Sequence, residues 1–278
     1  MTLKRILAVG AAIGTAIALA GVALAQDAGS PPPAAAQPAP AAAPAAVTPT
    51  DEAAPAVAVA LPDDGPAGPG DATRGEAKAA ACAACHGIDG NAVDPINPNL
   101  AGQHEHYIAR QLALFKSGER DNAIMMGFAA GLSSQDMRDI GAYYAKQTKR
   151  PGVADETVIA EGDNAGSKFY EVGKRLYRSG DTARGIPSCA ACHGPTGRGV
   201  PGPSWPSLQA QHAQYTAQTL RAFRDGMVWG KDANANVIMA SAARNLTDEE
   251  IDSLASYLQG LHDVRDAAPA AGTATAAR

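Results

Sequence analysis

The sequence CAACHG occupies residues 82–87 and occurs again at residues 189–194, and this repeated stretch decides how the chain folds. Cys-x-x-Cys-His is the attachment motif of c-type haem. The two thiols add to the vinyl groups of the porphyrin, and the histidine lies beneath the ring with its imidazole directed at the iron. One copy could be a coincidence, but two copies with matching downstream residues are hard to explain otherwise. The chain is therefore predicted to carry two covalently bound haem c groups.

All four cysteines of the chain belong to the two motifs, so none remains for a structural disulfide. His86 and His193 are predicted to be the proximal ligands of the two irons. Only 5% of the 278 residues are aromatic, which is little for one large core. Small domains built around a porphyrin would explain this, because the porphyrin supplies apolar surface. The predicted thioether residues are Cys82, Cys85, Cys189 and Cys192.

The chain from about residue 71 onward is an internal repeat. LAGQH at residues 100–104 matches LQAQH at 208–212, and Ile-Met occurs both at 124–125 and at 238–239. The period is roughly one hundred residues, far longer than a solenoid unit, so two homologous domains are expected. The expected divisions are a first haem domain at residues 71–150, a junction at 151–162, a second haem domain at 163–262 and a disordered tail at 263–278.

Both halves are predicted to be helical. A helix is expected over roughly 105–117. Ser133 with Asp136, and Thr247 with Glu250, have the spacing of a capping box at the start of the last helix of each half. The segments between are rich in Gly and Pro and lack the alternation of strands. We expect an all-α protein with two tandem domains, each wrapped around one haem.

Function depends on the sixth ligand of each iron, because a filled site carries electrons whereas an open site binds or activates small molecules. Met125 and Met239 lie at equivalent positions of the repeat, each after an isoleucine and seven residues before a leucine. Core packing is the commoner role of methionine, and it is assigned to Met126, which has no counterpart. Met125 and Met239, expected in irregular loops, are predicted to be the axial ligands that raise the haem potential.

Other recurring residues lie near the motifs. His104 and His212 are rival ligands, but their place beside glutamine at a helix start favours a capping or surface role. Pro98 and Pro206 follow the two motifs at nearly equal distance. A proline carbonyl can accept a hydrogen bond from the second nitrogen of the proximal imidazole and so fix its tautomer. The alternative is that these prolines only stiffen the loop, and both roles can hold.

The start of the chain is typical of an export signal. Lys4 and Arg5 precede an uncharged run that ends in the small-x-small sequence ALA at 23–25, so residues 1–25 are predicted to be removed. An uncleaved membrane anchor is the alternative, because the run is about long enough to span a bilayer. Residues 26–70 are rich in Ala and Pro and are predicted to form a disordered linker. Either form places the haem domains in the periplasm.

The formal net charge of the chain is −5. Much of the excess acidity lies in the linker and around the junction, which leaves each haem unit close to neutral before its propionates are counted. No basic patch suggests binding to nucleic acid.

Taken together, residues 71–262 resemble a dihaem cytochrome c4, which consists of two class I cytochrome c domains. The resemblance rests on both CAACHG motifs, the LAGQ and LQAQ helix starts, the paired methionines and the ending LASYLQGLH at 254–262. It implies a periplasmic electron carrier, often associated with the membrane, that serves terminal oxidases. It also implies two domains related by a pseudo-twofold axis, with the haem propionates facing each other across the interface.

Three functions can be compared. An electron carrier, which is not an enzyme, needs two six-coordinate irons, and the paired methionines supply them. It would accept electrons from a cytochrome bc1-type donor or a dehydrogenase and pass them to a terminal oxidase, with possible peripheral association with the membrane. The cytochrome subunit of a periplasmic dehydrogenase is barely distinguishable from this by sequence. A dihaem peroxidase would need one open iron site, and nothing in the two halves is asymmetric enough to suggest it.

Overall fold

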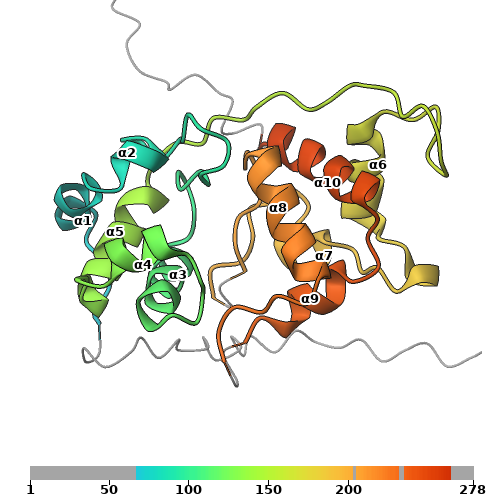
Figure 1. Cartoon of the computed structure of the whole chain (residues 1–278). Coiled ribbons are helices and arrows are strands. Elements are labelled where there is room, and N and C mark those ends of the chain that lie inside the picture. Colours follow the sequence, from blue (N-terminus) through green and yellow to red (C-terminus); the bar gives the residue numbers. More distant parts are fainter. Residues whose placement is uncertain (1–66, 203–204, 232–234, 264–278) are drawn as a thin grey trace, which may run out of the picture. The chain divides into compact units, whose positions relative to one another are not determined.

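The structure, a computed structural model, describes residues 67–202, 205–231 and 235–263, all of which belong to one unit of the chain. They form helices joined by irregular loops, with three isolated β-bridges and no strand (Figure 1). The prediction of an all-α chain is therefore confirmed for these residues.

The described residues contain no helix that is both long enough and apolar enough to cross a bilayer. The predicted signal at residues 1–25 lies outside them, as do most of the predicted linker at 26–70 and of the predicted tail at 263–278.

The helices divide between the two halves of the repeat. The first half contains α1 (Ala72–Ala79), α2 (Ala83–His86), α3 (Glu105–Ser117), α4 (Ala123–Ala129) and α5 (Ser134–Ala145). The second half contains α6 (Phe169–Ser179), the 3-10 helix η1 (Thr182–Arg184), α7 (Ala190–His193), α8 (Ala213–Arg224), α9 (Val237–Ala243) and α10 (Asp248–Gly260).

The predicted helix starts are present. The hydroxyl of Ser133 accepts a hydrogen bond from the backbone of Asp136, whose carboxylate accepts one from the Ser133 amide, and this capping box begins α5. Thr247 and Glu250 form the same box at the start of α10. The sequence signal worked because both partners of a capping box lie within one helical turn.

The first and last helices of each half cross with almost no space between them. A Cβ atom on Gly75 of α1 would lie 1.9 Å from the carbonyl oxygen of Asp139 in α5. A Cβ atom on Gly173 of α6 would lie 2.0 Å from the carbonyl oxygen of Ser253 in α10. The two glycines are thus equivalent positions at which a helix backbone touches its neighbour, and any side chain would force the helices apart.

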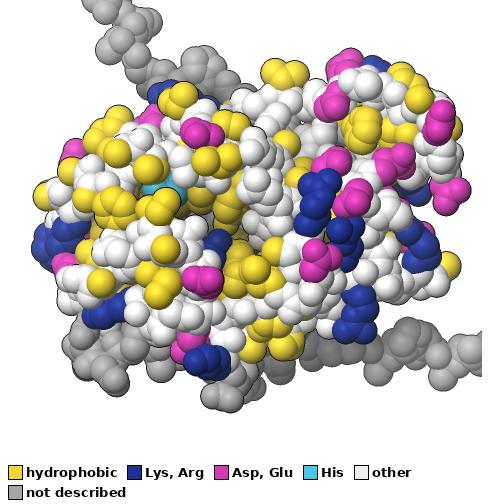
Figure 2. Space-filling model, in the orientation of Figure 1, with side chains coloured by type: hydrophobic (Ala, Val, Ile, Leu, Met, Phe, Trp, Pro, Cys, Tyr) yellow, Lys and Arg dark blue, Asp and Glu magenta, His cyan; other side chains and the backbone are white. Residues whose placement is uncertain are grey.

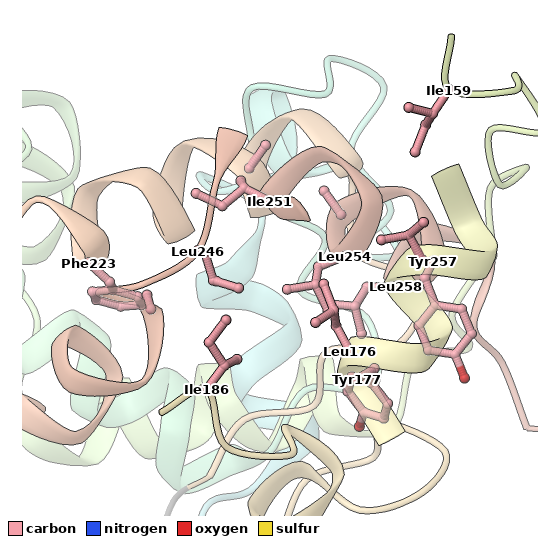
Figure 3. Close-up of a cluster of buried hydrophobic side chains, with 14 of the residues drawn as sticks. Ile159, Leu176, Tyr177, Ile186, Phe223, Leu246, Ile251, Leu254, Tyr257 and Leu258 are labelled. Atoms are coloured by element: carbon pink, nitrogen blue, oxygen red, sulfur yellow. The ribbon is translucent and has the colours of Figure 1, made fainter. Parts of the chain in front are cut away.

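Apolar side chains surround the second crossing. Leu176 and Tyr177 of α6 pack with Leu254 and Tyr257 of α10 in a cluster of buried residues (Figure 3). The rings of Tyr177 and Tyr257 lie 5.5 Å apart between centroids. A smaller cluster in the first half joins α1, α3 and α5. Each half thus has a buried cluster that its first motif cysteine contacts, and the larger cluster also includes Leu114 of α3 in the first half.

The first part of the predicted junction at residues 151–162 is bound along α10, and its later part bonds residues 166–169. The Gly152 amide donates to the carbonyl of Gln259 (3.0 Å), and the Gln259 side chain donates to the carbonyl of Val153 (2.7 Å). The Asp155 amide donates to the hydroxyl of Ser256 (2.7 Å). This segment therefore runs as an irregular strap on the second half.

Candidate haem and iron sites

Each Cys-x-x-Cys-His motif winds into a single helical turn, α2 in the first half and α7 in the second. The amide of His86 donates to the carbonyl of Cys82 (3.0 Å), and the amide of His193 donates to that of Cys189 (2.9 Å). Gly87 follows α2 with φ 77°, a conformation that favours glycine, and a Cβ there would lie 2.4 Å from the Asn91 carbonyl oxygen. The turn therefore keeps both cysteines and the histidine of a motif close together.

The imidazoles of the two motifs have equivalent hydrogen-bond partners. Nδ1 of His86 lies 2.9 Å from the carbonyl oxygen of Pro98, and Nδ1 of His193 lies 2.9 Å from that of Pro206. A carbonyl only accepts, so Nδ1 carries the proton and Nε2 keeps a lone pair. Burial lowers the pKa of both imidazoles, which favours the neutral form that ligates metals. Each histidine thus presents a metal-ligating nitrogen in a fixed tautomer.

No disulfide joins any of the four cysteines. The first thiol of each motif, Cys82 or Cys189, packs against the core of its half. Burial raises the pKa of Cys82, and it raises that of Cys189 to about 11. Cys85 is exposed and Cys192 is partly buried. Two thiols and one lone-pair nitrogen within a single turn fit the attachment of haem c, so the residues present suit the predicted cofactor.

The predicted sixth ligands do not lie in irregular loops. Met125 is the third residue of α4 and Met239 the third residue of α9, so the loop expectation was wrong. Asn122 stabilises the start of α4, because its side chain accepts a hydrogen bond from the Met125 amide (3.0 Å) as an N-cap. Both methionines are partly buried and contact the core of their own half. The structure thus places them equivalently, as the repeat predicted.

The structure corrects the capping role expected of the rival histidines. His104 and His212 occupy the N-cap positions of α3 and α8, but neither side chain makes a capping hydrogen bond. Nε2 of His212 lies 2.9 Å from the carbonyl oxygen of Ala92, in the first half of the repeat. Both residues are partly buried, so they are not surface groups either. Their environment is the contact between the two halves.

Two glutamines join the halves reciprocally. Gln211 accepts from the Asn99 amide (2.8 Å) and donates to the Asn99 carbonyl (3.0 Å). Gln103 accepts from the Ser207 amide (2.9 Å) and donates to the Ser207 carbonyl (2.9 Å). Sequence reasoning missed these residues as functional candidates. The available signal was the recurrence of glutamine in LAGQH and LQAQH.

Arg120 makes a second contact between the halves. Its guanidinium carbon lies 3.5 Å from the ring centroid of Trp229 and 4.6 Å from that of Phe115. The same group donates to the hydroxyl of Tyr215 (2.9 Å) and to the side chain of Gln111 (2.6 Å). A cation held between two aromatic rings adds to the stability of this contact.

Comparison with known proteins agrees with the geometry. The cytochrome c family model matches residues 72–147 and 170–262. Cytochrome c4 of Pseudomonas aeruginosa is 42% identical over 193 residues, which are 69% of this chain and 90% of that protein. The crystal structure of reduced cytochrome c4 from Pseudomonas stutzeri superposes with a TM-score of 0.62 at 38% identity and covers 69% of this chain and 100% of that one.

A further relative is named for its electron donor. The thiosulfate dehydrogenase electron acceptor of Stutzerimonas stutzeri is 38% identical over 180 residues, which are 64% of this chain and 78% of that protein. The cytochrome c family model matches the chain twice, and each match contains one haem-attachment motif. The chain also covers the whole of a cytochrome c4 structure. The chain belongs to the dihaem cytochrome c4 family of electron carriers and binds two covalent haem c groups.

Proposed function

We propose that the protein carries single electrons between respiratory partners in the periplasm, with one iron ligated by His86 and Met125 and the other by His193 and Met239. One observation carries the proposal. The same arrangement occurs twice, with a buried histidine hydrogen-bonded to a proline carbonyl and an equivalent methionine in a short helix. Two filled iron sites leave no position for a substrate.

The role of the protein chain is to keep the axial ligands of each iron unchanged. When bound, each haem supplies an iron that alternates between the ferrous and ferric states. Pro98 and Pro206 fix the orientation of the imidazoles, and a thioether from methionine favours reduced iron and so raises the potential. We take residues 71–150 and 163–262 as the two electron-carrying domains and 151–162 as their junction.

The proposed partners are a bc1-type donor and a terminal oxidase. Exposed apolar residues lie beside each methionine, namely Ile124 and Phe128 on α4 and Val237 and Ile238 on α9. Hydrophobic side chains also gather on the face over α2 to α5, whereas acidic and basic side chains gather over α8 and α10 (Figure 2). Haem units that are near neutral and have apolar rims suit docking by short-range contact.

Electron transfer to a membrane oxidase should therefore depend only weakly on salt. The experiment measures oxidation of the reduced protein by the oxidase at low and high ionic strength, next to an assay of peroxide consumption. A rate that changes less than about threefold is expected, because steering by opposite charges would be screened steeply. A steep decline with salt would contradict apolar docking. Fast peroxide consumption would contradict the carrier role itself.

A dehydrogenase partner is the second candidate, and the similarity to a thiosulfate dehydrogenase electron acceptor favours it. In that case the protein accepts electrons from a periplasmic dehydrogenase. Reduction of the oxidised protein by purified thiosulfate dehydrogenase with thiosulfate tests this directly. Reduction at a rate comparable to that of the enzyme's own acceptor would favour it over the bc1-type donor.

Export and haem number can be checked in one measurement. We propose that residues 1–25 are a cleaved signal and that residues 26–70 form a linker ahead of the haem domains. The intact mass of the exported protein should equal the chain from residue 26 plus two haems, and both haems should survive acid–acetone extraction because thioethers hold them. A mass with one haem, or loss of haem on extraction, would contradict the attachment. A mass that includes residues 1–25 would favour the membrane anchor.

A further inference from the structure

A single peptide group connects each proximal histidine to the opposite half of the protein. The carbonyl of the Pro98–Asn99 peptide faces Nδ1 of His86 at 2.9 Å, and the amide of the same peptide donates to Gln211 at 2.8 Å. In the second half, the carbonyl of the Pro206–Ser207 peptide faces Nδ1 of His193 at 2.9 Å. Its amide donates to Gln103 at 2.9 Å.

These glutamines are held in place by further hydrogen bonds. The side-chain oxygen of Gln103 also accepts from the His104 amide (2.9 Å), and that of Gln211 accepts from the His212 amide (3.0 Å). The side-chain nitrogen of Gln103 donates to the carbonyl of Ser207, and that of Gln211 donates to the carbonyl of Asn99. Gln103 is buried, with 6% of its surface exposed, so its amide has little competing water. Hydrogen bonds at both the side-chain oxygen and the side-chain nitrogen therefore fix the orientation of each glutamine.

The physical consequence follows from the polarisation of the peptide group. An amide that donates a hydrogen bond makes the carbonyl of the same peptide a stronger acceptor, because hydrogen bonds in a chain strengthen one another. A stronger acceptor at Nδ1 makes the imidazole a more basic ligand. A more basic ligand stabilises ferric iron and so lowers the reduction potential.

We infer that each glutamine tunes the potential of the haem in the opposite half, Gln211 acting on the iron of His86 and Gln103 on the iron of His193. They are positioning residues, because each acts through a peptide and an imidazole. The inference rests on the proposed ligation by these two histidines. It makes the contact between the halves a determinant of both potentials.

The test is a pair of variants in the full-length dihaem protein, Gln211→Leu and Gln103→Leu. Leucine has a similar size and cannot accept the amide hydrogen bond. A redox titration followed by NMR of the haem methyl groups gives the potential of each haem separately. Gln211→Leu should raise the potential of the first haem and leave the second unchanged, and Gln103→Leu should do the reverse. The reduced-to-oxidised ratio of the affected haem should rise by a factor of about two to ten at fixed ambient potential.

A second readout does not depend on electron transfer. In the reduced protein, the Nδ1 proton signal of His86 should move upfield in Gln211→Leu, because its hydrogen bond to Pro98 weakens. Gln259→Leu is the matched control, since Gln259 also bonds two backbone groups, those of Ala213 and Val153, but none next to a proximal histidine. This control should leave both potentials and both proton signals unchanged.

The outcomes separate the inference from the proposed function. A shift confined to the opposite haem supports the inference. A shift in the haem of the variant's own half, an equal shift in both, or no shift would overturn it, provided that both irons keep their histidine–methionine spectrum. If the unaltered protein lacks that spectrum, the proposed ligation fails first. If one variant does not fold, the reciprocal variant gives the same test.

Discussion

Replacing Met125 or Met239 by alanine is expected to remove one of two iron–sulfur bonds. The oxidised protein should lose half of the weak absorption band at the red end of the spectrum that reports this bond. The potential of one iron should fall, because the thioether that favours the reduced state is gone. Optical spectra of the oxidised form and a redox titration measure both effects. The double variant should lose the band completely.

Met126→Ala is the matched control for Met125→Ala. Met126 lies next to Met125 in α4 and is partly buried as well, but it has no counterpart in the second half. The change should keep the whole red band and both potentials. If Met126→Ala removed half of the band while Met125→Ala kept it, the register taken from the repeat would be wrong.

Gly173→Ala is expected to have the largest effect on stability. The new Cβ would lie 2.0 Å from the carbonyl oxygen of Ser253, so α6 and α10 would have to separate along a packed contact. Overpacking of a core costs 1–3 kcal/mol and occasionally more, and a clash with backbone cannot be relieved by a side-chain rotation. The free energy of unfolding should fall by about 3 kcal/mol, measured by guanidinium chloride titration of the haem-bound protein. Gly75→Ala should act similarly on α1 and α5.

Gly202→Ala is the control for this prediction. Gly202 lies in a loop of the same half, and a Cβ there would meet nothing within 4 Å. The free energy of unfolding should change by less than about 0.5 kcal/mol, as is usual for surface substitutions. An equally small change in Gly173→Ala would show that the two helices adapt to the added carbon.

Features that depend on residues close in sequence were predictable. The capping boxes of α5 and α10 involve partners three residues apart, and the carbonyl of Pro98 meets an imidazole only 12 residues away. The repeat itself gave the equivalence of Met125 and Met239 without any knowledge of the fold.

Features that depend on distant partners were not predictable. Gln103 bonds a residue 104 positions away, and no local pattern indicates which backbone group a glutamine will meet. Gly75 and Gly173 look like weak points of a helix until the crossing helix is known. The helix around Met125 was missed because seven residues are too few to show a helical period, although Asn122 was a usable N-cap signal.

The reciprocal hydrogen bonds that Gln103 and Gln211 make with the opposite half also bear on how the two-domain chain arose. Asn99 meets Gln211 while its counterpart Ser207 meets Gln103, which is the reciprocal pattern of an isologous interface between identical subunits. Two copies of a single-haem ancestor could pair through this pattern as a symmetric dimer. Joining them in one gene adds no new contact, but it raises the effective concentration of one half near the other. Fusion then lets the two originally identical faces diverge, as Asn99 and its counterpart Ser207 have done. It also gives one molecule two haems whose properties selection can adjust separately.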